Sequence, residues 1–191
     1  MSEMRRILIY ITVTAAALCV AASSHAQAPP KVFVDPGACP FKCCTYRQWT
    51  VRSNTVLYDR PEGTPVSEVR KGERVVAIDG EVHVVPTPMT VVFKHEGFRV
   101  GDRVFLLTYL GEGWMKVWFK GKISTHELPF IQSWRPQRSD VWPTCGQPSA
   151  ECWGRIEKRE SFDWWILIRT ANGERGWTKQ YDHFDGQDAC G

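Results

Sequence analysis

The chain has 191 residues, of which 43% are hydrophobic, and a formal net charge of +3 at pH 7. A chain of this length can bury one good core or two small ones. Its 24 basic and 21 acidic residues are interspersed without a run of five like charges, which argues against a dedicated nucleic-acid binder.

Residues 1–26 have the pattern of a secretory signal peptide. A short basic region precedes an apolar stretch, residues 7–22, that is too short and too early to indicate a membrane span. Small residues follow, which places cleavage after Ala26, with Ala28 as the alternative. An uncleaved anchor is the competing interpretation. We expect a periplasmic or secreted bacterial protein with no stable membrane insertion after cleavage.

Residues 27–48 form a proline-rich N-terminal arm with three of the six cysteines that follow the signal peptide. An even number of cysteines in an exported protein indicates a disulfide framework, which would staple this arm to the rest of the chain. Two cysteines enclose a short loop near residue 148 and are the favoured pair, and the C-terminal cysteine is expected to join the cluster in the arm. Adjacent cysteines are poor partners for each other. The six are Cys39, Cys43, Cys44, Cys145, Cys152 and Cys190.

Zinc binding and redox catalysis are two sharper interpretations of these cysteines. Cys39, Cys43 and Cys44 have roughly the spacing of zinc ligands, but no second compact pair of cysteine or histidine completes a tetrahedron. The sequence has no Cys-x-x-Cys and no helix start that would lower a thiol pKa. We therefore expect no metal and no cofactor.

From residue 49 onward the sequence predicts strands and turns, and no long window has a helical period. Asp79-Gly80 predicts a hairpin between two strands. Proline residues interrupt the strands between residues 123 and 144. The expected strands before that linker cover 49–52, 55–58, 65–69, 74–78, 81–85, 90–94, 103–109 and a segment opened by Trp114.

The strongest hairpin signal lies at residues 164–177. Aromatic and β-branched residues crowd its first arm, and Asn172-Gly173 supplies the turn. A tryptophan opens this strand as it opens the strand at Trp114, which we interpret as a weak internal repeat. The expected units are 49–122, with an insertion at 79–102, and 145–191, separated by a linker at 123–144.

This pattern resembles the bacterial SH3-like (SH3b) domain family. The resemblance rests on a Lys-Gly turn at 71–72, on Gly-Trp-x-x-Val at 113–117, on Asn-Gly at 172–173 and on a closing Gly-Trp at 176–177. It implies an all-β fold of tandem small SH3-like β-barrels in two divergent copies. The first copy lacks the closing Gly-Trp and the second lacks a clear divergent loop, so one elaborated barrel remains the alternative.

Strand alternation predicts which side chains form the core. Met115, Val117 and Phe119 share one face, which is the natural core face of the first unit. In the second unit Trp165 and Leu167 match that face. The opposite face, with Ile166 and Ile168, is apolar as well, which predicts packing between the units or an exposed patch for a partner.

Nine tryptophans lie beyond the signal peptide, and a core position is favoured for any single one. Strand parity and the groove that the resemblance implies nominate a smaller set as ligand-binding residues. In SH3-like domains such aromatic residues take peptides or cell-wall peptide stems. The candidates are Tyr58, Trp114, Trp118, Trp164 and Tyr181.

Motifs for catalysis are missing from the sequence. It has no histidine pair at metalloprotease spacing, no nucleophile elbow, no phosphate-binding loop and no dinucleotide fingerprint. We therefore expect a non-catalytic exported binding protein for a peptidoglycan peptide or a periplasmic protein. A periplasmic inhibitor or immunity-type protein that blocks an enzyme or toxin, with the 79–102 insertion protruding, is the alternative. An enzyme that uses a metal or a thiolate is the least favoured class.

Overall fold

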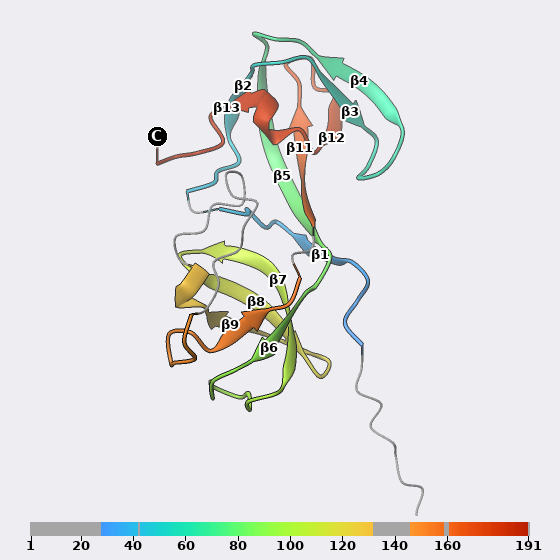
Figure 1. The fold of residues 1–191 in the computed structure, drawn as a ribbon. Coiled ribbons are helices and arrows are strands. Elements are labelled where there is room, and N and C mark those ends of the chain that lie inside the picture. The colour runs from blue at the N-terminus through green and yellow to red at the C-terminus, as the bar shows by residue number, and fades with distance from the viewer. Residues whose placement is uncertain (1–27, 42, 132–145, 159–160, 191) are drawn as a thin grey trace, which may run out of the picture.

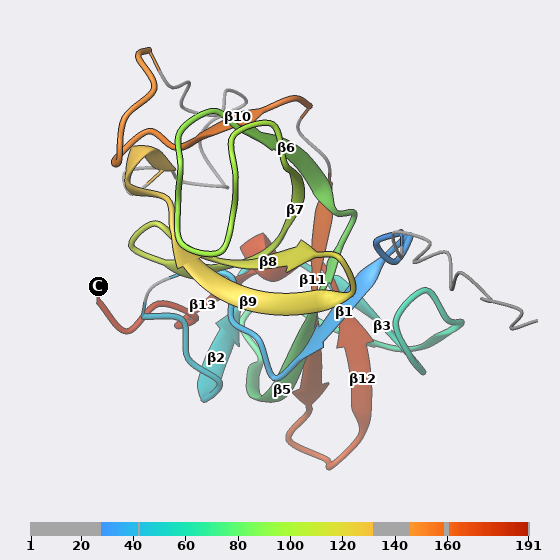
Figure 2. The ribbon, with the colours of Figure 1, turned by 90° about the horizontal axis from the view of Figure 1, so that it is seen from below.

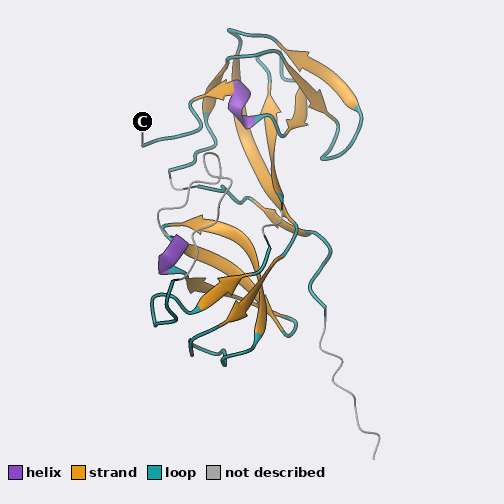
Figure 3. Cartoon of the chain, in the orientation of Figure 1, coloured by secondary structure: helices purple, strands orange, loops and turns teal. Residues whose placement is uncertain are grey.

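In the computed structural model, two curled antiparallel β-sheets form two lobes (Figures 1 and 3). The structure describes residues 28–41, 43–131, 146–158 and 161–190. Within these ranges the helical elements are two short 3-10 turns, η1 (Pro129–Ile131) and η2 (Tyr181–His183). The expected all-β fold is therefore confirmed. The predicted signal peptide and most of the predicted linker lie outside the described residues, and no helix in the described part is long and apolar enough to cross a membrane.

The first sheet has eight strands from both ends of the chain, in the order β13-β2-β5-β11-β12-β3-β4, with β1 also paired to β5. All of its strand pairs are antiparallel. The strands are β1 (Phe33–Pro36), β2 (Gln48–Val51), β3 (Thr55–Tyr58), β4 (Pro65–Val69), β5 (Arg74–Val84), β11 (Phe162–Arg169), β12 (Arg175–Thr178) and β13 (Phe184–Asp185).

The second sheet has five strands from the middle of the chain, in the order β10-β6-β7-β8-β9. Seen from below, its strands curl around an enclosed core (Figure 2). The strands are β6 (Thr87–Val91), β7 (Arg103–Gly111), β8 (Trp114–Phe119), β9 (Lys122–Glu127) and β10 (Gly154–Ile156).

The strand pairing does not follow the predicted division into units 49–122 and 145–191. β5 of the first predicted unit pairs with β11 of the second over eight residue pairs, from Phe162↔Val84 to Arg169↔Val76. The intervening strands β6 to β10 form a sheet of their own. The chain thus builds one lobe from two distant segments, with the other lobe inserted between them. Alternation within a strand does not encode which distant strand it pairs with, and this explains the difference.

β5 runs without a break through Asp79-Gly80, where the sequence predicted a hairpin. Gly80 serves close packing instead, because a Cβ atom there would lie 2.9 Å from the carbonyl oxygen of Trp165 and would also collide with the hydroxyl of Tyr46. The carbonyl oxygen of Gly80 accepts a hydrogen bond from the amide of Gly37 at 2.7 Å. A glycine inside a strand pattern marks a close approach here, and not a turn.

The face of β11 that points into the core of the first lobe is the opposite of the predicted face with Trp165 and Leu167. Trp164, Ile166 and Ile168 point into this core, and Trp165 lies on the opposite face although its side chain is only 2% exposed. The expectation that both faces of this strand are covered therefore fits the structure, and residues of the predicted first unit contribute to the cover on both faces, because their strands belong to the same sheet as β11. The ring of Tyr58 covers Trp165, edge-on at 5.9 Å between centroids.

Disulfides staple the arm, as the cysteine pattern predicted. Cys43 bonds to Cys190 and so ties the C-terminus to the arm, and Cys39 bonds to Cys44. Cys152 is also disulfide-bonded, and Cys145, its predicted partner, lies outside the described residues. These bonds indicate an oxidising environment for the folded chain.

The core of the second lobe contains Met115 and Val117, as strand alternation predicted, whereas Phe119 is half-buried. Trp153 fills this core, and its indole nitrogen donates a hydrogen bond to the carbonyl oxygen of Glu127 at 2.9 Å. The ring of His95 stacks on Trp153 with parallel planes and 4.0 Å between centroids. The loop that contains His95, the segment that contains Trp153 and the edge strand β9 therefore meet at this tryptophan.

His95 and His126 lie beside Trp153, and their surroundings predict a loss of stability in mild acid. Burial lowers the pKa of His95, and burial together with the nearby charge of His95 lowers the pKa of His126, whose ring lies 5.4 Å away. When the pH falls below 6.5, the ordinary pKa of histidine, the unfolded chain therefore binds more protons than the folded chain. The urea midpoint should therefore fall between about pH 7.5 and about pH 5.5. A His95→Phe/His126→Gln variant should lose that dependence, and an equal pH slope in both proteins would contradict the assignment.

An ion pair connects the two sheets. Asp35 on β1 is nearly buried, and both of its carboxylate oxygens accept hydrogen bonds from the ammonium of Lys116 on β8, at 2.7 and 2.8 Å. Breaking a buried pair leaves a charge without a partner, which costs several kcal/mol. The pair therefore fixes the N-terminal arm against the outer face of the second sheet.

Candidate ligand-binding groove

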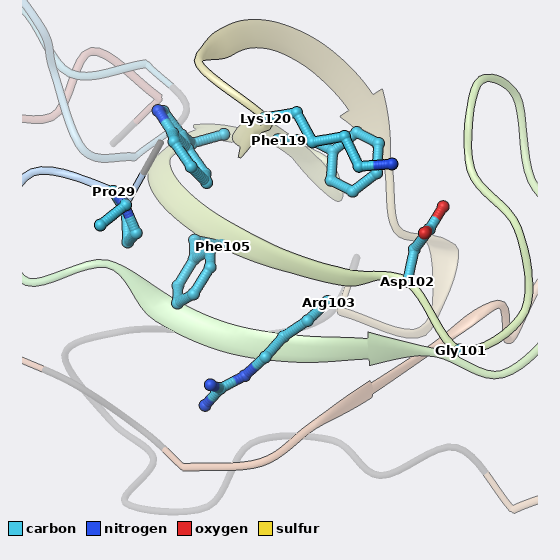
Figure 4. Close-up of a pocket in the computed structure, with 9 residues that line it drawn as sticks. Pro29, Gly101, Asp102, Arg103, Phe105, Phe119 and Lys120 are labelled. Carbon is cyan, nitrogen blue, oxygen red and sulfur yellow. The ribbon is translucent and has the colours of Figure 1, made fainter. Parts of the chain in front are cut away.

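A groove of about 350 Å³ lies on the outer face of the five-stranded sheet (Figure 4). Strands β7 and β8 supply its floor, the turns beside them supply one end, and the N-terminal arm supplies a wall. Its lining residues are Ala28, Pro29, Gly101, Asp102, Arg103, Phe105, Trp118, Phe119 and Lys120.

The floor is the centre of an apolar row that crosses four strands and extends past the groove lining at both ends. The register places Pro88 opposite Phe105, Phe105 opposite Trp118, and Trp118 opposite Ile123. Residues directly opposite in a sheet share a face, so these four side chains lie side by side. Phe105 and Trp118 contact edge to face, with 5.6 Å between ring centroids. Ile123, at the end of the row, remains 50% exposed.

This row is separate from the core of the lobe. The neighbouring residues Val104, Leu106 and Val117 point to the other side of the sheet and are completely buried there. β7 is therefore apolar on both faces, and Trp118 of β8 extends its second apolar face. Such strands are covered on both sides in most proteins, and here the second face carries the groove.

Cationic side chains flank the aromatic floor. The guanidinium carbon of Arg103 lies 5.4 Å from the centre of the Phe105 ring, and its group donates to the Glu157 carboxylate at 2.9 Å. The Thr90 hydroxyl donates to the same carboxylate at 2.7 Å, and these two hydrogen bonds hold the pKa of Glu157 below its usual range. The ammonium of Lys120 lies 4.5 Å from the Phe119 ring centre.

Figure 4 shows how these groups are distributed around the groove. Pro29 lies on the side of Phe105, whereas Phe119 and Lys120 lie at the other end. A ligand in the groove would thus contact apolar rings along its length and, at one end, both the ammonium of Lys120 and the carboxylate of Asp102. The arrangement suits an extended chain with apolar side chains and a polar group at that end.

The structure does not bring the five predicted site residues together. Trp118 lines the groove, and Trp114 lies on the same strand with 43% of its side chain exposed, outside the groove lining. Tyr58 packs on Trp165 on the outer face of the other sheet. The predicted binding surface is therefore divided between two lobes.

Trp164 is a correction to the predicted site. Its side chain is 1% exposed and lies inside the first core, so it has no surface to offer a ligand. Tyr181 is half-buried and packs against Trp164, with 5.7 Å between ring centroids. Trp164, the first of the two adjacent tryptophans near the start of β11, points inward because the rings of Phe41 and Tyr46 in the arm cover it from that side.

Sequence reasoning identified Trp118 and missed the other eight lining residues, among them Arg103, Phe105, Phe119 and Lys120. One signal could have found part of this set. Residues 103–107 are apolar at nearly every position, so alternation leaves Phe105 on the face opposite Val104. An aromatic residue on that second face, opposite Trp118, indicates a platform.

Within the described residues, one group of three potential metal ligands comes together: Cys43, Asp188 and Cys190, with ligand atoms within 4.8 Å of one another. The two sulfurs are joined in a disulfide and therefore offer no thiolate to a metal. This group is part of the disulfide link that joins the C-terminus to the N-terminal arm.

No protein-family model, curated protein or solved structure matches the chain. The resemblance to SH3-like domains therefore rests on the sequence motifs alone.

Proposed function

We propose that this protein is a non-catalytic exported binding protein whose groove takes an extended peptide of the cell wall or of a periplasmic protein. The observation that carries the proposal is the apolar row on the outer face of the five-stranded sheet. It joins Phe105, Trp118 and Ile123 on a face that the core of the lobe does not use.

Three properties of the row support a binding role. Phe105, which is half-buried, and Trp118, which is 7% exposed, form a rigid aromatic floor that loses little conformational entropy on contact with a ligand. The flanking Arg103, Lys120 and Asp102 place polar groups beside the apolar floor, and such groups can orient a ligand by hydrogen bonds. The partly open end at Ile123 gives an incoming chain access to the floor.

The setting of the chain agrees with this function. The disulfides of the arm need an oxidising compartment, and we propose the bacterial periplasm or the exterior of the cell. The SH3-like motifs support the same ligand class, since the resemblance implies a peptide or a cell-wall peptide stem. The two lobes would then be elaborated SH3-like barrels.

The alternative is an inhibitor or immunity-type protein that blocks an enzyme or toxin. One observation favours it: Phe93 and Val100, in the loop between β6 and β7, expose apolar side chains to solvent. The predicted protruding insertion at 79–102 is not a single element, because its first part is the end of β5 and its next part is β6. Only the loop could serve as the blocking element.

Co-sedimentation with isolated peptidoglycan sacculi at two salt concentrations tests the proposed function. The wild-type protein should pellet at both, because burial of apolar area resists salt. Ile123→Ser should weaken binding by about tenfold, since it removes a buried apolar contact from the complex.

Val66→Ser is the matched control, because Val66 is equally exposed but lies on β4 of the other sheet. It should pellet like the wild-type protein. Wild-type protein that stays in the supernatant would reject a cell-wall ligand and favour a protein partner. Equal pelleting of the Ile123→Ser variant would show that the apolar row is not the binding site.

A further inference from the structure

The loop between β6 and β7, residues 92–102, forms the end of the second lobe that points away from the first sheet (Figures 1 and 2). Two apolar side chains of this loop face solvent, since Phe93 is 40% exposed and Val100 is 65% exposed. Val100 has the largest exposed fraction of any large apolar side chain among the described residues. A protruding element with exposed apolar side chains is typical of a contact surface.

The two arms of this loop are linked at its base and at its tip. The amide of Gly101 donates a hydrogen bond to the carbonyl oxygen of Val91 at 2.9 Å, which closes the base. A turn at residues 95–98 closes the tip. Phe93 and Val100 stand on opposite arms between these two links, so one short element presents both side chains.

The loop also has a fixed shape. The side chain of Phe98 is 5% exposed and packs in the core of the lobe. The amides of Val92 and Phe93 both donate to the carbonyl oxygen of Trp153, at 2.8 and 3.2 Å. These contacts hold the exposed side chains at the surface, and a preorganised loop loses little conformational entropy when it docks.

The turn between β8 and β9, residues 119–122, lies beside the loop. The rings of Phe98 and Phe119 contact edge to face, with 5.2 Å between centroids. Gly101 of the loop and Lys120 of the turn both line the groove. Loop and turn therefore form one continuous surface, and we call residues 92–102 and 119–122 the tip surface.

Positive charges outnumber negative charges on the tip surface. Its four cationic side chains are exposed, and within the described part of the chain none of them lies within ion-pair distance of a carboxylate. Of its two carboxylates, that of Asp102 accepts a hydrogen bond from the backbone amide of Arg99 at 2.8 Å. The four cations are Lys94, Arg99, Lys120 and Lys122, and the second carboxylate is Glu96.

This mixture of side chains favours a lipid surface over a protein partner. Lysine is depleted in protein–protein interfaces. Elements that lie on membranes combine Lys and Arg with Phe and other apolar side chains, which enter the headgroup region. On the tip surface each exposed apolar side chain has a cation next to it in the chain, Lys94 after Phe93 and Arg99 before Val100. Apolar contact and attraction to phosphate are therefore available at the same place.

We infer that the tip surface docks the folded protein on a surface of anionic phospholipid. Phe93 and Val100 enter the headgroup region, and the four cations contact the lipid phosphates. The contact is peripheral, because only side chains of one loop enter the lipid. It is independent of the proposed ligand of the groove, since neither Phe93 nor Val100 lines the groove.

Sedimentation with lipid vesicles tests this inference. Vesicles with equal parts of phosphatidylglycerol and phosphatidylcholine should bind the protein at low salt, and added salt should weaken the binding. Vesicles of phosphatidylcholine alone should bind it at least about tenfold more weakly, because each cation near an anionic surface adds to the attraction. Wild-type protein that binds neither kind of vesicle, or both equally, would overturn the inference and leave the loop to a protein partner.

Two double variants separate the charges of the tip surface from its apolar contacts. Lys94→Glu/Arg99→Glu should weaken binding to the anionic vesicles by about tenfold to a hundredfold. Phe93→Ser/Val100→Ser should weaken it by about tenfold, because less apolar area enters the headgroup region. Near-ultraviolet circular dichroism checks that each variant keeps the native fold.

Matched controls lie on the first lobe. Arg70→Glu/Lys71→Glu makes the same change in net charge at the β4–β5 turn, at the other end of the molecule (Figure 1). Val56→Ser/Val66→Ser removes apolar side chains that are 36% and 53% exposed on β3 and β4. Each control should change the binding by less than about threefold, since charges beyond a Debye length are screened. A control as weak as its counterpart on the tip surface would show adsorption without a defined site and would overturn the inference.

Discussion

Replacing Cys43 and Cys190 with serine should lower the free energy of unfolding by about 4–5 kcal/mol. This disulfide joins residues 147 positions apart, and a cross-link stabilises mainly by removing conformations from the unfolded chain, more so for longer loops. The measurement is urea denaturation under oxidising conditions, with the midpoint and slope compared with those of the wild-type protein.

The second disulfide of the arm is a matched control. Cys39 and Cys44 are only five positions apart, and the chain-entropy relation assigns this short loop about 3 kcal/mol less than the long one. A Cys39→Ser/Cys44→Ser variant should therefore lose about 2 kcal/mol. Equal losses in the two variants would contradict the view that loop length sets the effect.

Polar contacts should keep part of the C-terminal tail in place without its disulfide. The amide of Ala189 donates to the carbonyl oxygen of Cys43 at 2.8 Å, and the Arg47 side chain donates to the carbonyl oxygens of Gly186 and Asp188. The serine variant should thus remain folded at low urea. Its loss should appear mainly as a lower midpoint of one cooperative transition.

The sequence predicts the strands of this fold far better than it predicts their partners. Alternation and turn residues identify most strands because these signals are local. The pairing of β5 with β11 joins residues 78 to 93 positions apart and depends on packing that forms only in the folded chain. Gly80 shows the same limit, because Asp-Gly is a hairpin signal locally and a point of close packing globally.

The alternation of side chains along a strand predicts the core only where one face of the strand contains a polar residue. On β8 the opposite face contains Lys116, so Met115 and Val117 were assigned correctly. On β11 both faces are apolar, and the choice between Trp164 and Trp165 is made by the residues that cover each. The arm supplies the cover for Trp164, and nothing in the pattern of β11 specifies the arm.

The groove was predictable only in part for a related reason. Trp118 is identified by its parity on β8, and Phe105 by its place on a strand that is apolar on both faces. The wall at Pro29 depends on the pair between Asp35 and Lys116, which are 81 positions apart. A contact between an irregular arm and a distant sheet leaves no period in the sequence.

Trp164→Ala should be among the most destabilising single substitutions in the chain, with a loss of about 3–5 kcal/mol. The indole is completely enclosed, and its ring packs against Phe41, Trp49 and Tyr181 with centroids 5.6 to 6.0 Å away. Truncation removes all of these contacts and leaves a cavity that the rigid sheet cannot close.

A hydrogen-bond chain adds to the expected loss. The indole nitrogen of Trp164 donates to the Tyr46 hydroxyl at 3.0 Å, and that hydroxyl donates to the carbonyl oxygen of Ala38 at 2.7 Å. Burial raises the pKa of Tyr46 to about 12, so the phenol stays protonated and keeps this role at any ordinary pH. Without the indole, the buried oxygen loses its donor.

Trp114→Ala provides the comparison, because this tryptophan is 43% exposed and lies outside both cores. It should cost less than about 1 kcal/mol, measured by urea denaturation and by the near-ultraviolet circular dichroism of the folded protein. A Trp164→Ala variant as stable as Trp114→Ala would return Trp164 to the surface and to the list of ligand-binding residues. The expected difference means that any binding defect of Trp164→Ala reports loss of the fold, whereas a defect of Trp114→Ala in a stable protein would extend the groove along β8.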